Sequence, residues 1–207
     1  MKNELIIRPE APADYAAAEA LTREAFWNVY RPGCLEHYVL HCFRGRKDFI
    51  PQLSLLLEQN GKIIGHVMYA RSEIHTDSGT DLPIMTFGPL SIHPACQRQG
   101  YGTMLLRESM RRAEHLGAGA LAIEGNIGFY GKSGFAIAST KGIHYADEPR
   151  DAQVPYFLIC ELKPGFLDGV TGTYRDPDGY FVSEAEALRF DAAFPPKEKK
   201  KLPGQLF

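Results

Sequence analysis

The most constraining feature of the sequence is a stretch near its middle, where an apolar run leads through a polar, glycine-bearing loop into an amphipathic helix. The run ends at residues 90–94, the loop holds Gly100 and Gly102, and a helix is expected over residues 101–116. Backbone N–H groups in the first turn of a helix have no acceptors within that helix, and the helix dipole adds partial positive charge there. The stretch therefore predicts a site for the oxygens of a phosphate.

The loop composition narrows the kind of phosphate ligand. Gly100 and Gly102 remove side chains where a pyrophosphate would approach the backbone, and Arg98 supplies a full positive charge. The Gly-Lys-Ser/Thr of a nucleotide P-loop is missing, and position 105 is Leu105 rather than the third glycine of a dinucleotide fingerprint. Both nucleotide interpretations are weakened, and a merely flexible strand-to-helix turn stays open as an alternative.

Apolar periodicity and turn residues predict a mixed order of strands and helices along the chain. Helices are expected over residues 11–26, 34–43, 101–116 and 183–190, with a short helical or turn segment at 127–133. Strands are expected over residues 5–8, 53–58, 62–71, 82–92, 118–123 and 156–162. Asn60-Gly61 predicts a tight hairpin between the second and third of these, and Gly88-Pro89 predicts a bulge or splay in the fourth.

Length and break points suggest one main domain with an appendage. The chain has 207 residues, and Pro164-Gly165 ends the last expected core strand. We therefore expect a domain over residues 1–165 and a C-terminal extension over residues 166–207. The extension is too short for an independent core, so we expect it to pack on the main domain. Its segment 176–179 is expected to form a turn.

Composition excludes several classes of protein. The 23 Lys+Arg against 25 Asp+Glu, a formal net charge of -2, give no footprint for nucleic acid. The sequence offers no apolar run long enough for a membrane span or a signal-peptide core, so we expect a soluble, cytoplasmic protein without a membrane partner. Four irregularly spaced cysteines are expected to be reduced thiols.

Three linked motifs give the chain a family resemblance. They are Gln97-x-x-Gly100-x-Gly102, the preceding hydrophobic-x-hydrophobic-x-Pro pattern at residues 90–94, and Phe129-Tyr130 followed by Gly-Phe at residues 134–135. In these motifs, the sequence from about residue 5 to 162 resembles the GNAT superfamily of N-acetyltransferases. The resemblance implies an α/β (mixed α+β) fold with a central, mostly antiparallel twisted sheet, splayed strands four and five, flanking helices and, here, a C-terminal extension.

The resemblance also implies a cofactor site. Acetyl-CoA (CoA) would be the co-substrate, with no metal. Backbone groups of Leu90 and Ile92 would pair with the pantetheine arm, and the loop amides of residues 98–103 would hold the pyrophosphate. The implied cofactor-binding residues are Leu90, Ile92, Gln97, Arg98, Gln99, Gly100, Tyr101, Gly102, Thr103, Asn126, Phe129 and Lys132. For Lys132, a solvated surface lysine is an equal alternative.

Amine acetylation needs a base and an acid. A lysine-like amine with a pKa of about 10.4 is almost wholly protonated at neutral pH and must lose a proton before it attacks. By resemblance, Tyr130 is expected to protonate the departing thiolate, with core packing as the alternative. Glu124, at the expected end of a strand, is the first candidate for the base, with an ordinary solvated or capping glutamate as its alternative role. Glu73 and His75 are the second candidates, and a water chain could deprotonate the amine instead.

Two further groups of residues could bind a ligand, and each has packing as its alternative role. His37 and His41 are four residues apart on an expected helix, a spacing that can hold a metal, but no carboxylate motif follows and a half-buried helix face is favoured. The resemblance places an acceptor wall at an aromatic cluster, for which core packing is the default: Phe26, Trp27, Tyr30, Arg31 and Tyr38.

The sequence therefore predicts an enzyme, an acetyl-CoA-dependent N-acetyltransferase of the acyltransferase class. It would move the acetyl group to a primary amine of a small molecule or peptide by direct attack in a ternary complex. The alternative is a non-catalytic acyl-CoA-binding sensor on the same fold. The expected partner is the amine acceptor, the expected state is a monomer or homodimer, and the identity of the acceptor is not encoded in the fold or the cofactor loop.

Overall fold

The structure is a computed structural model that describes residues 4–206, so the outer limits of the two expected domains, at residues 1 and 207, lie outside the described residues. The chain divides into two compact units. Unit 1 runs up to Met68, continues over Pro89–Leu106 and resumes at Asp178. Unit 2 comprises Tyr69–Gly88 and Arg107–Pro177. The expected extension is thus shared between the units, with residues 166–177 in unit 2.

The elements of the chain mix both kinds of secondary structure, as expected. The helices are α1 (Tyr15–Phe26), α2 (Glu36–Phe43), α3 (Tyr101–His115), α4 (Ile127–Tyr130) and α5 (Glu184–Asp191). The strands are β1 (Leu5–Pro9), β2 (Leu55–Gln59), β3 (Lys62–Thr76), β4 (Asp81–Ile92), β5 (Ala120–Glu124), β6 (Ala136–Ile137), β7 (Ile143–Tyr145), β8 (Phe157–Glu161) and β9 (Gly172–Tyr174). Within residues 4–206, no helix has the length and apolar character needed to cross a bilayer.

The nine strands form a mostly antiparallel sheet, which confirms the predicted fold class. Hydrogen-bonded neighbours follow the order β1-β2-β3-β4-β5-β8-β6, and β9 pairs with β3 and β7. β4 and β5 are parallel, and their ladder holds two Cα pairs, Met85–Leu121 and Thr86–Ala122. It stops two residues before Gly88, whose φ of +132° favours glycine. This is the splay that Gly88-Pro89 predicted.

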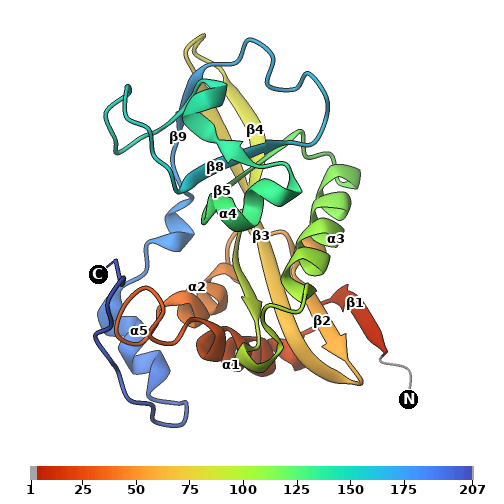
Figure 1. Ribbon diagram of the computed structural model, residues 1–207, viewed down its shortest axis with the longest axis vertical. Helices are drawn as coiled ribbons and strands as arrows, with labels where there is room; N and C mark the ends of the chain where they lie inside the picture. The colour runs from red at the N-terminus through yellow and green to blue at the C-terminus, as the bar shows by residue number, and fades with distance from the viewer. Residues whose placement is uncertain (1–3, 207) are drawn as a thin grey trace. The chain divides into compact units, whose positions relative to one another are not determined.

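Unit 1 is built on the hairpin of β2 and β3. Its turn residues Asn60 and Gly61 have φ values of 50° and 76°, as a tight hairpin turn requires. α1 packs against α2, and α5, which follows them by more than 140 residues, lies beside α2 (Figure 1). The ion pair between Arg23 Nε and Asp191 Oδ1, at 2.6 Å, ties α5 to α1.

Unit 2 holds β5 to β9, the part of β3 from Tyr69 onward and the part of β4 up to Gly88. β8 pairs antiparallel with β5 and β6, and β9 joins the far end of β3 with Ile74 opposite Tyr174. Phe157 and Tyr174 stack at 4.9 Å in the core of this unit. The sequence-based end of β3 at residue 71 is wrong, because pairing with β9 carries the strand to Thr76.

Candidate functional site

The cofactor loop predicted from the sequence lies in unit 1. β4 leads into a 3-10 turn, Pro94–Cys96, and then to α3. The His93 N–H donates to the carbonyl of Ile64 at 2.8 Å. The side-chain amide of Gln97 reaches back and donates to the carbonyl of Ile92 at 3.0 Å. Gln97 therefore braces the loop against the strand, and its role in this structure is to hold the loop's shape.

The backbone of this loop turns sharply before the helix. Arg98 and Gly100 have φ values of 59° and 88°, both in the left-handed region. Apart from its two chain neighbours, no heavy atom of residues 4–206 lies within 4 Å of the position that a Cβ would take at Gly100, so the space beside the turn is open. The Met104 N–H donates to the Gly100 carbonyl at 3.0 Å, which starts the helical bonding. The amides before it are left for an external acceptor.

Other predicted residues support the loop from its sides. The Gln99 side chain donates to the carbonyl of Ala95 at 3.1 Å, and the Tyr101 hydroxyl accepts from the Gln59 side chain at 2.7 Å. Gly65 of β3 was missed by the sequence reasoning. A Cβ there would overlap Ile92 and crowd Leu105, so its lack of a side chain allows α3 to pack closely on the strands.

Unit 2 carries the predicted Phe129-Tyr130 motif and Asn126, which precedes it. The Asn126 side chain accepts from the Gly128 N–H at 2.7 Å and so caps α4. The rings of Phe129 and Tyr130 meet edge to face at 4.8 Å. Asn126, Phe129 and Tyr130 thus lie together on α4 and its N-cap, and the Asn126 side chain has a structural role as the cap.

The Tyr130 ring is fixed by its surroundings within unit 2. It meets the edges of Phe87 and Phe135 at 5.8 and 5.6 Å. Gly125 lies beneath it, and a Cβ at that position would overlap the ring. Gly125 is a residue that sequence reasoning missed, because a glycine between a strand and a helix has no distinctive signal.

The remaining predicted residues lie at the surface of unit 2. The side chain of Lys132 is exposed, and its carbonyl accepts from Arg107 at 3.4 Å. Glu73 and His75 lie exposed on β3, where His75 Nδ1 is 2.6 Å from Asp81 Oδ1. This hydrogen bond raises the pKa of His75.

Glu124, the first candidate for the base, ends β5. Partial burial of its carboxyl group and the nearby carboxyl of Asp176 raise the pKa of Glu124. Tyr145 is its other neighbour. Neither Tyr145 nor Asp176 was singled out from the sequence for a site, because they come from β7 and from the residue pair after β9, distant in sequence from Glu124.

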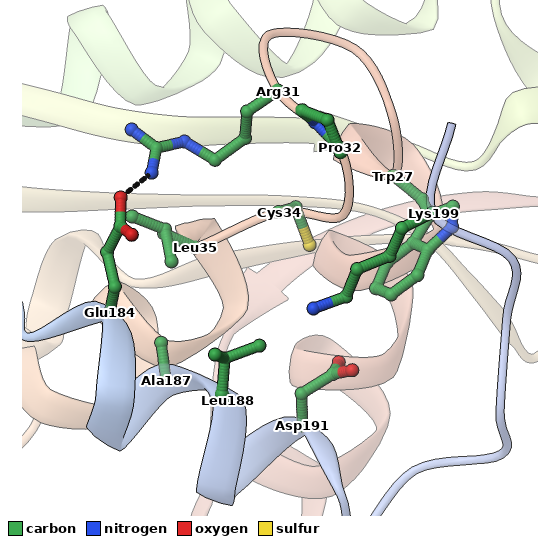
Figure 2. A pocket seen from close by; sticks show the side chains of 10 residues that line it. All are labelled: Trp27, Arg31, Pro32, Cys34, Leu35, Glu184, Ala187, Leu188, Asp191 and Lys199. Atoms are coloured by element: carbon green, nitrogen blue, oxygen red, sulfur yellow. Dashed lines mark hydrogen bonds and ion pairs between the residues drawn. The ribbon is translucent and has the colours of Figure 1, made fainter. Parts of the chain in front are cut away.

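A pocket of about 160 Å³ lies within unit 1 between the segment after α1 and the C-terminal residues. Figure 2 shows the Lys199 amine and the Cys34 thiol pointing into it, with Trp27 and Asp191 at one end. Trp27 and Arg31 of the predicted acceptor wall line this pocket. Their assignment to an acceptor site stays a prediction.

At this pocket, the side chains of Cys34, His37 and Asp191 lie in a row. Cys34 Sγ lies 3.3 Å from His37 Nδ1, and His37 Nε2 lies 3.1 Å from Asp191 Oδ1. Burial lowers the pKa of His37 to about 4 and raises the pKa of the Cys34 thiol to about 12. Both groups are therefore neutral near pH 7, and the row does not supply a thiolate nucleophile.

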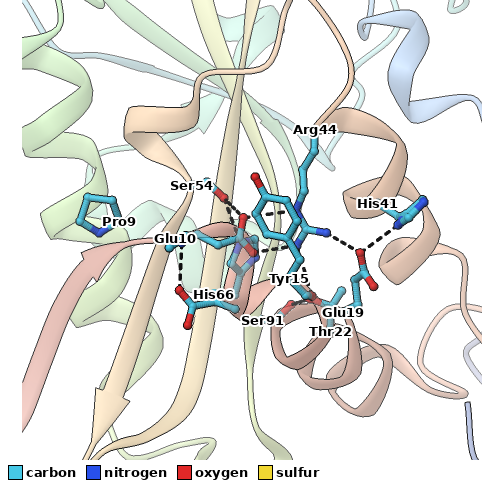
Figure 3. A network of polar contacts seen from close by, with 12 residues as sticks. Pro9, Glu10, Tyr15, Glu19, Thr22, His41, Arg44, Ser54, His66 and Ser91 are labelled. Atoms are coloured by element: carbon cyan, nitrogen blue, oxygen red, sulfur yellow. Dashed lines mark hydrogen bonds and ion pairs between the residues drawn. The ribbon is translucent and has the colours of Figure 1, made fainter.

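His41 is turned to a different partner from His37. The Nδ1 atom of His41 lies 3.0 Å from Glu19 Oε1 (Figure 3), whereas His37 faces Asp191, so the two histidine side chains have different partners. Glu19 also pairs with Arg44, whose Nη2 lies 2.7 Å from Glu10 Oε1. Arg44 thus forms ion pairs with two carboxylates and links α1, α2 and the end of β1. We call Arg44, Glu10 and Glu19 the Arg44 cluster.

Beside the Arg44 cluster, polar contacts continue to Ser54 and His66 of the hairpin region. The Ser54 hydroxyl donates to Glu10 Oε2 at 2.8 Å and lies 3.1 Å from His66 Nε2. Burial lowers the pKa of His66 to about 4, so the imidazole is neutral near pH 7. These contacts are those of a structural network, since the cation and both carboxylates satisfy one another.

Known proteins resemble this chain in sequence and in fold. It is 31% identical over 94 residues to a protein of Escherichia coli (strain K12) described as the uncharacterized N-acetyltransferase YjhQ, which covers 44% of this chain and 51% of that protein. The chain thus spans about half the length of the curated relative it matches.

Solved structures extend the similarity over most of the fold. The GNAT family N-acetyltransferase YhbS from Escherichia coli, in complex with CoA, has a TM-score of 0.75 at 21% identity, covering 88% of this chain and 94% of that one. A GNAT family acetyltransferase from Brucella melitensis, in complex with acetyl-CoA, has a TM-score of 0.67 at 25% identity, covering 86% and 98%.

The model of the acetyltransferase (GNAT) family matches residues 18–135, which include the loop of unit 1 and the Phe129-Tyr130 motif of unit 2. The match covers more than half of the chain, and the fold agrees with the solved members. The chain belongs to the GNAT family of acetyltransferases.

Proposed function

We propose that this chain is an acetyl-CoA-dependent N-acetyltransferase that acts on a primary amine of a small molecule or peptide by direct attack in a ternary complex. The observation that carries the proposal is the loop from Gln97 to Gly102. Its left-handed turn is braced by Gln97, is open at Gly100 and leads into the first turn of α3, whose backbone amides are suited to bind an anion. The acetyl-CoA complex of the Brucella melitensis relative supports the same type of ligand.

The proposed cofactor contacts follow the family resemblance. Amides of residues 98–103 would hold the pyrophosphate, with Arg98 as the added charge, and the backbone of Leu90 and Ile92 would pair with the pantetheine arm. The carbonyl of Ile92 already accepts from Gln97 at 3.0 Å, so its second lone pair would take part in that pairing. Acetyl-CoA supplies the acetyl group as a thioester.

In the proposed reaction, Glu124 takes a proton from the acceptor amine, and the neutral nitrogen forms a bond to the acetyl carbon as the carbon–sulfur bond breaks. Tyr130 gives its hydroxyl proton to the departing thiolate, and the tyrosinate regains a proton from the acetylated nitrogen, which loses its second proton as the amide forms. A backbone N–H near Leu90 to Ile92 would stabilise the charge that develops on the carbonyl oxygen. Asn126, Phe129 and Lys132 would border the cofactor.

The test is the release of free thiol from acetyl-CoA by the purified chain with a panel of amines, polyamines, amino acids, aminoglycosides and peptide N-termini. Calorimetric binding of CoA is measured in parallel. Turnover with an amine supports the proposal and gives the acceptor class. Tight CoA binding without turnover on any amine favours the non-catalytic sensor, and the lack of CoA binding would falsify the assignment of the loop.

A loop variant sharpens this test. In Arg98→Asn, the asparagine tolerates the left-handed backbone while the charge is lost, so we expect CoA to bind about tenfold more weakly. The control is Arg189→Asn, an exposed arginine on α5, which should bind CoA like the original chain.

A cytoplasmic location and a monomeric or homodimeric state stay predictions of the sequence.

A further inference from the structure

The chain on either side of Lys199 is fixed to the segment that follows α1 in unit 1. The carbonyl of Glu198 accepts from the side chains of Trp27 and Asn28, at 2.9 and 3.0 Å. The Lys200 N–H donates to Asn28 Oδ1 at 3.0 Å. The backbone before and after Lys199 is therefore held by the same short segment, which fixes the point from which the Lys199 side chain starts.

Gly33 leaves room for the Lys199 side chain on its way to the pocket of unit 1. The φ of Gly33 is +82°, in the region that favours glycine. A Cβ at Gly33 would lie 3.1 Å from Lys199 Cε and 3.4 Å from Cδ, which is closer than ordinary van der Waals contact. The lysine stem thus passes close to the Gly33 backbone, and its amine points into the pocket of about 160 Å³ (Figure 2).

Lys199 brings a positive charge that the other charges of the lining do not neutralise at close range. Arg31 forms an ion pair with Glu184. Asp191, the other carboxylate of the lining, accepts from Nε and Nη2 of Arg23 at 2.6 and 3.3 Å. Over residues 4–206, no carboxylate oxygen lies within 4.0 Å of the Lys199 amine, and its charge acts on Asp191 from farther away.

The walls around this amine are mostly apolar. Hydrocarbon or aromatic surface comes from Trp27, Pro32, Leu35, Ala187 and Leu188. Beside them, the Glu36 carboxylate accepts from the Leu35 N–H at 2.9 Å, so this acid has a partner of its own. Lys199 is itself exposed, which leaves a way in from solvent. An ammonium at the edge of an apolar pocket suits a ligand with a negative group and a short apolar body.

We propose that this pocket is a binding site for a small carboxylate with a short apolar body. The Lys199 ammonium pairs with the carboxylate, and the apolar walls cover the body of the ligand. Arg31 stays with Glu184, and Asp191 stays with Arg23. The site is built from α5, the C-terminal residues and the segment after α1, so it is separate from the residues proposed for acetyl transfer.

The test uses Trp27, because it lines the pocket and is the single tryptophan of the chain. Isovalerate, which is transparent where tryptophan absorbs, is titrated into the purified full chain at constant ionic strength while the fluorescence is recorded. Isovaleramide and isopentylamine are the neutral and cationic controls. We expect a saturable change with isovalerate at a Kd of about 1 mM, at least about tenfold weaker binding of the amide, and no binding of the amine.

Two substitutions link the binding to Lys199. Lys199→Met keeps the stem and removes the charge, so isovalerate should bind about tenfold more weakly. Lys199→Glu reverses the charge, and isopentylamine should then bind more tightly than isovalerate, a reversal that a loss of folding cannot produce. The control is Lys201→Met, at an exposed lysine near the same end of the chain, and its affinity for isovalerate should equal that of the original chain.

The outcomes decide the proposal even if the variants at Lys199 do not fold. Equal binding of isovalerate and isovaleramide by the original chain overturns it, as does a titration without saturation up to about 100 mM. An unchanged affinity in Lys199→Met overturns it, and so does an equal loss in Lys201→Met, which would assign the binding to net charge. Since acetyl-CoA is absent from these titrations, the result does not depend on whether the chain acetylates an amine.

Discussion

In unit 1, Glu10 and Glu19 share the guanidinium of Arg44, whereas in unit 2 Glu124 has another carboxyl group and tyrosine hydroxyls as neighbours. The residue type is the same in both places. Beside an arginine the two carboxylates form ion pairs that hold elements together, since loss of one partner would leave an unpaired charge in the interior. For Glu124, loss of hydration and the nearby carboxyl group of Asp176 raise the pKa. The cation decides which carboxylates are structural.

The same contrast separates the two places where a nucleophile or acid could lie. Cys34, His37 and Asp191 have the order of a catalytic triad, but burial keeps the thiol and the imidazole neutral. Tyr130 has ordinary packing partners but lies on the family motif. Geometry resembling a triad is therefore a weaker guide here than the protonation state of its members.

The largest expected effect is on unit 1. Arg44→Leu leaves Glu10 and Glu19 buried without their cation, so we expect the free energy of unfolding to fall by about 3–5 kcal/mol. Urea unfolding measures it. Glu124→Gln is the matched carboxyl change in unit 2, expected to alter stability by less than about 1 kcal/mol. If the free energy of unfolding of Arg44→Leu fell by less than about 1 kcal/mol, the ion pairs of the Arg44 cluster would contribute little to stability.

The second prediction concerns acid. His66 is fully buried and neutral in the folded chain, with its pKa lowered from 6.5 to about 4. The unfolded chain therefore binds more protons, so stability falls as pH drops from about 6.5 to 4 and this contribution levels off below, a loss of about 3 kcal/mol. Urea unfolding at pH 7, 5.5 and 4 should show it, and the slope should flatten in His66→Gln. Equal slopes in both would assign the acid sensitivity to other groups.

The third prediction sharpens the chemistry of unit 2. Tyr130→Phe removes the proposed acid and keeps the ring among Phe87 and Phe135, so kcat should fall about 100-fold with CoA affinity unchanged. Tyr69→Phe is the control, a buried tyrosine of the same unit whose hydroxyl lies 2.8 Å from Ser109, and its kcat should change little. Full activity in Tyr130→Phe would leave the thiolate to be protonated by water.

The smallest expected effect comes from Gly125→Ala. Its added methyl group displaces the Tyr130 ring, and a small misplacement of an acid should lower kcat about tenfold with little effect on KM for acetyl-CoA. Gly45→Ala, where a Cβ would have ordinary contact with the Cys42 carbonyl, is the control in the same thiol-release assay. Equal rates for the two variants would mean that the ring has room to move.

Much of the architecture was predictable from short-range patterns, whereas the long-range partners were not. Asn60-Gly61 marked the hairpin, Gly88-Pro89 marked the end of β4–β5 pairing, and residues 97–102 marked the left-handed turn before α3. The short strands β7 and β9 have three residues each and no periodicity to detect, so residues 176–179 were read only as a turn. The neighbours of Glu124 were missed for that reason.

The sequence by itself determined the turn chemistry, the helix that follows the cofactor loop and the family motifs, because each depends on residues a few positions apart whose backbone preferences act locally. Only the tertiary structure decided which charges meet. Asp191 reaches Arg23 across 168 positions, and Asp176 is brought to Glu124 by the pairing of β9 with β3 and β7. Such pairings depend on burial and packing across the whole chain, and they fix which charged groups lie near one another.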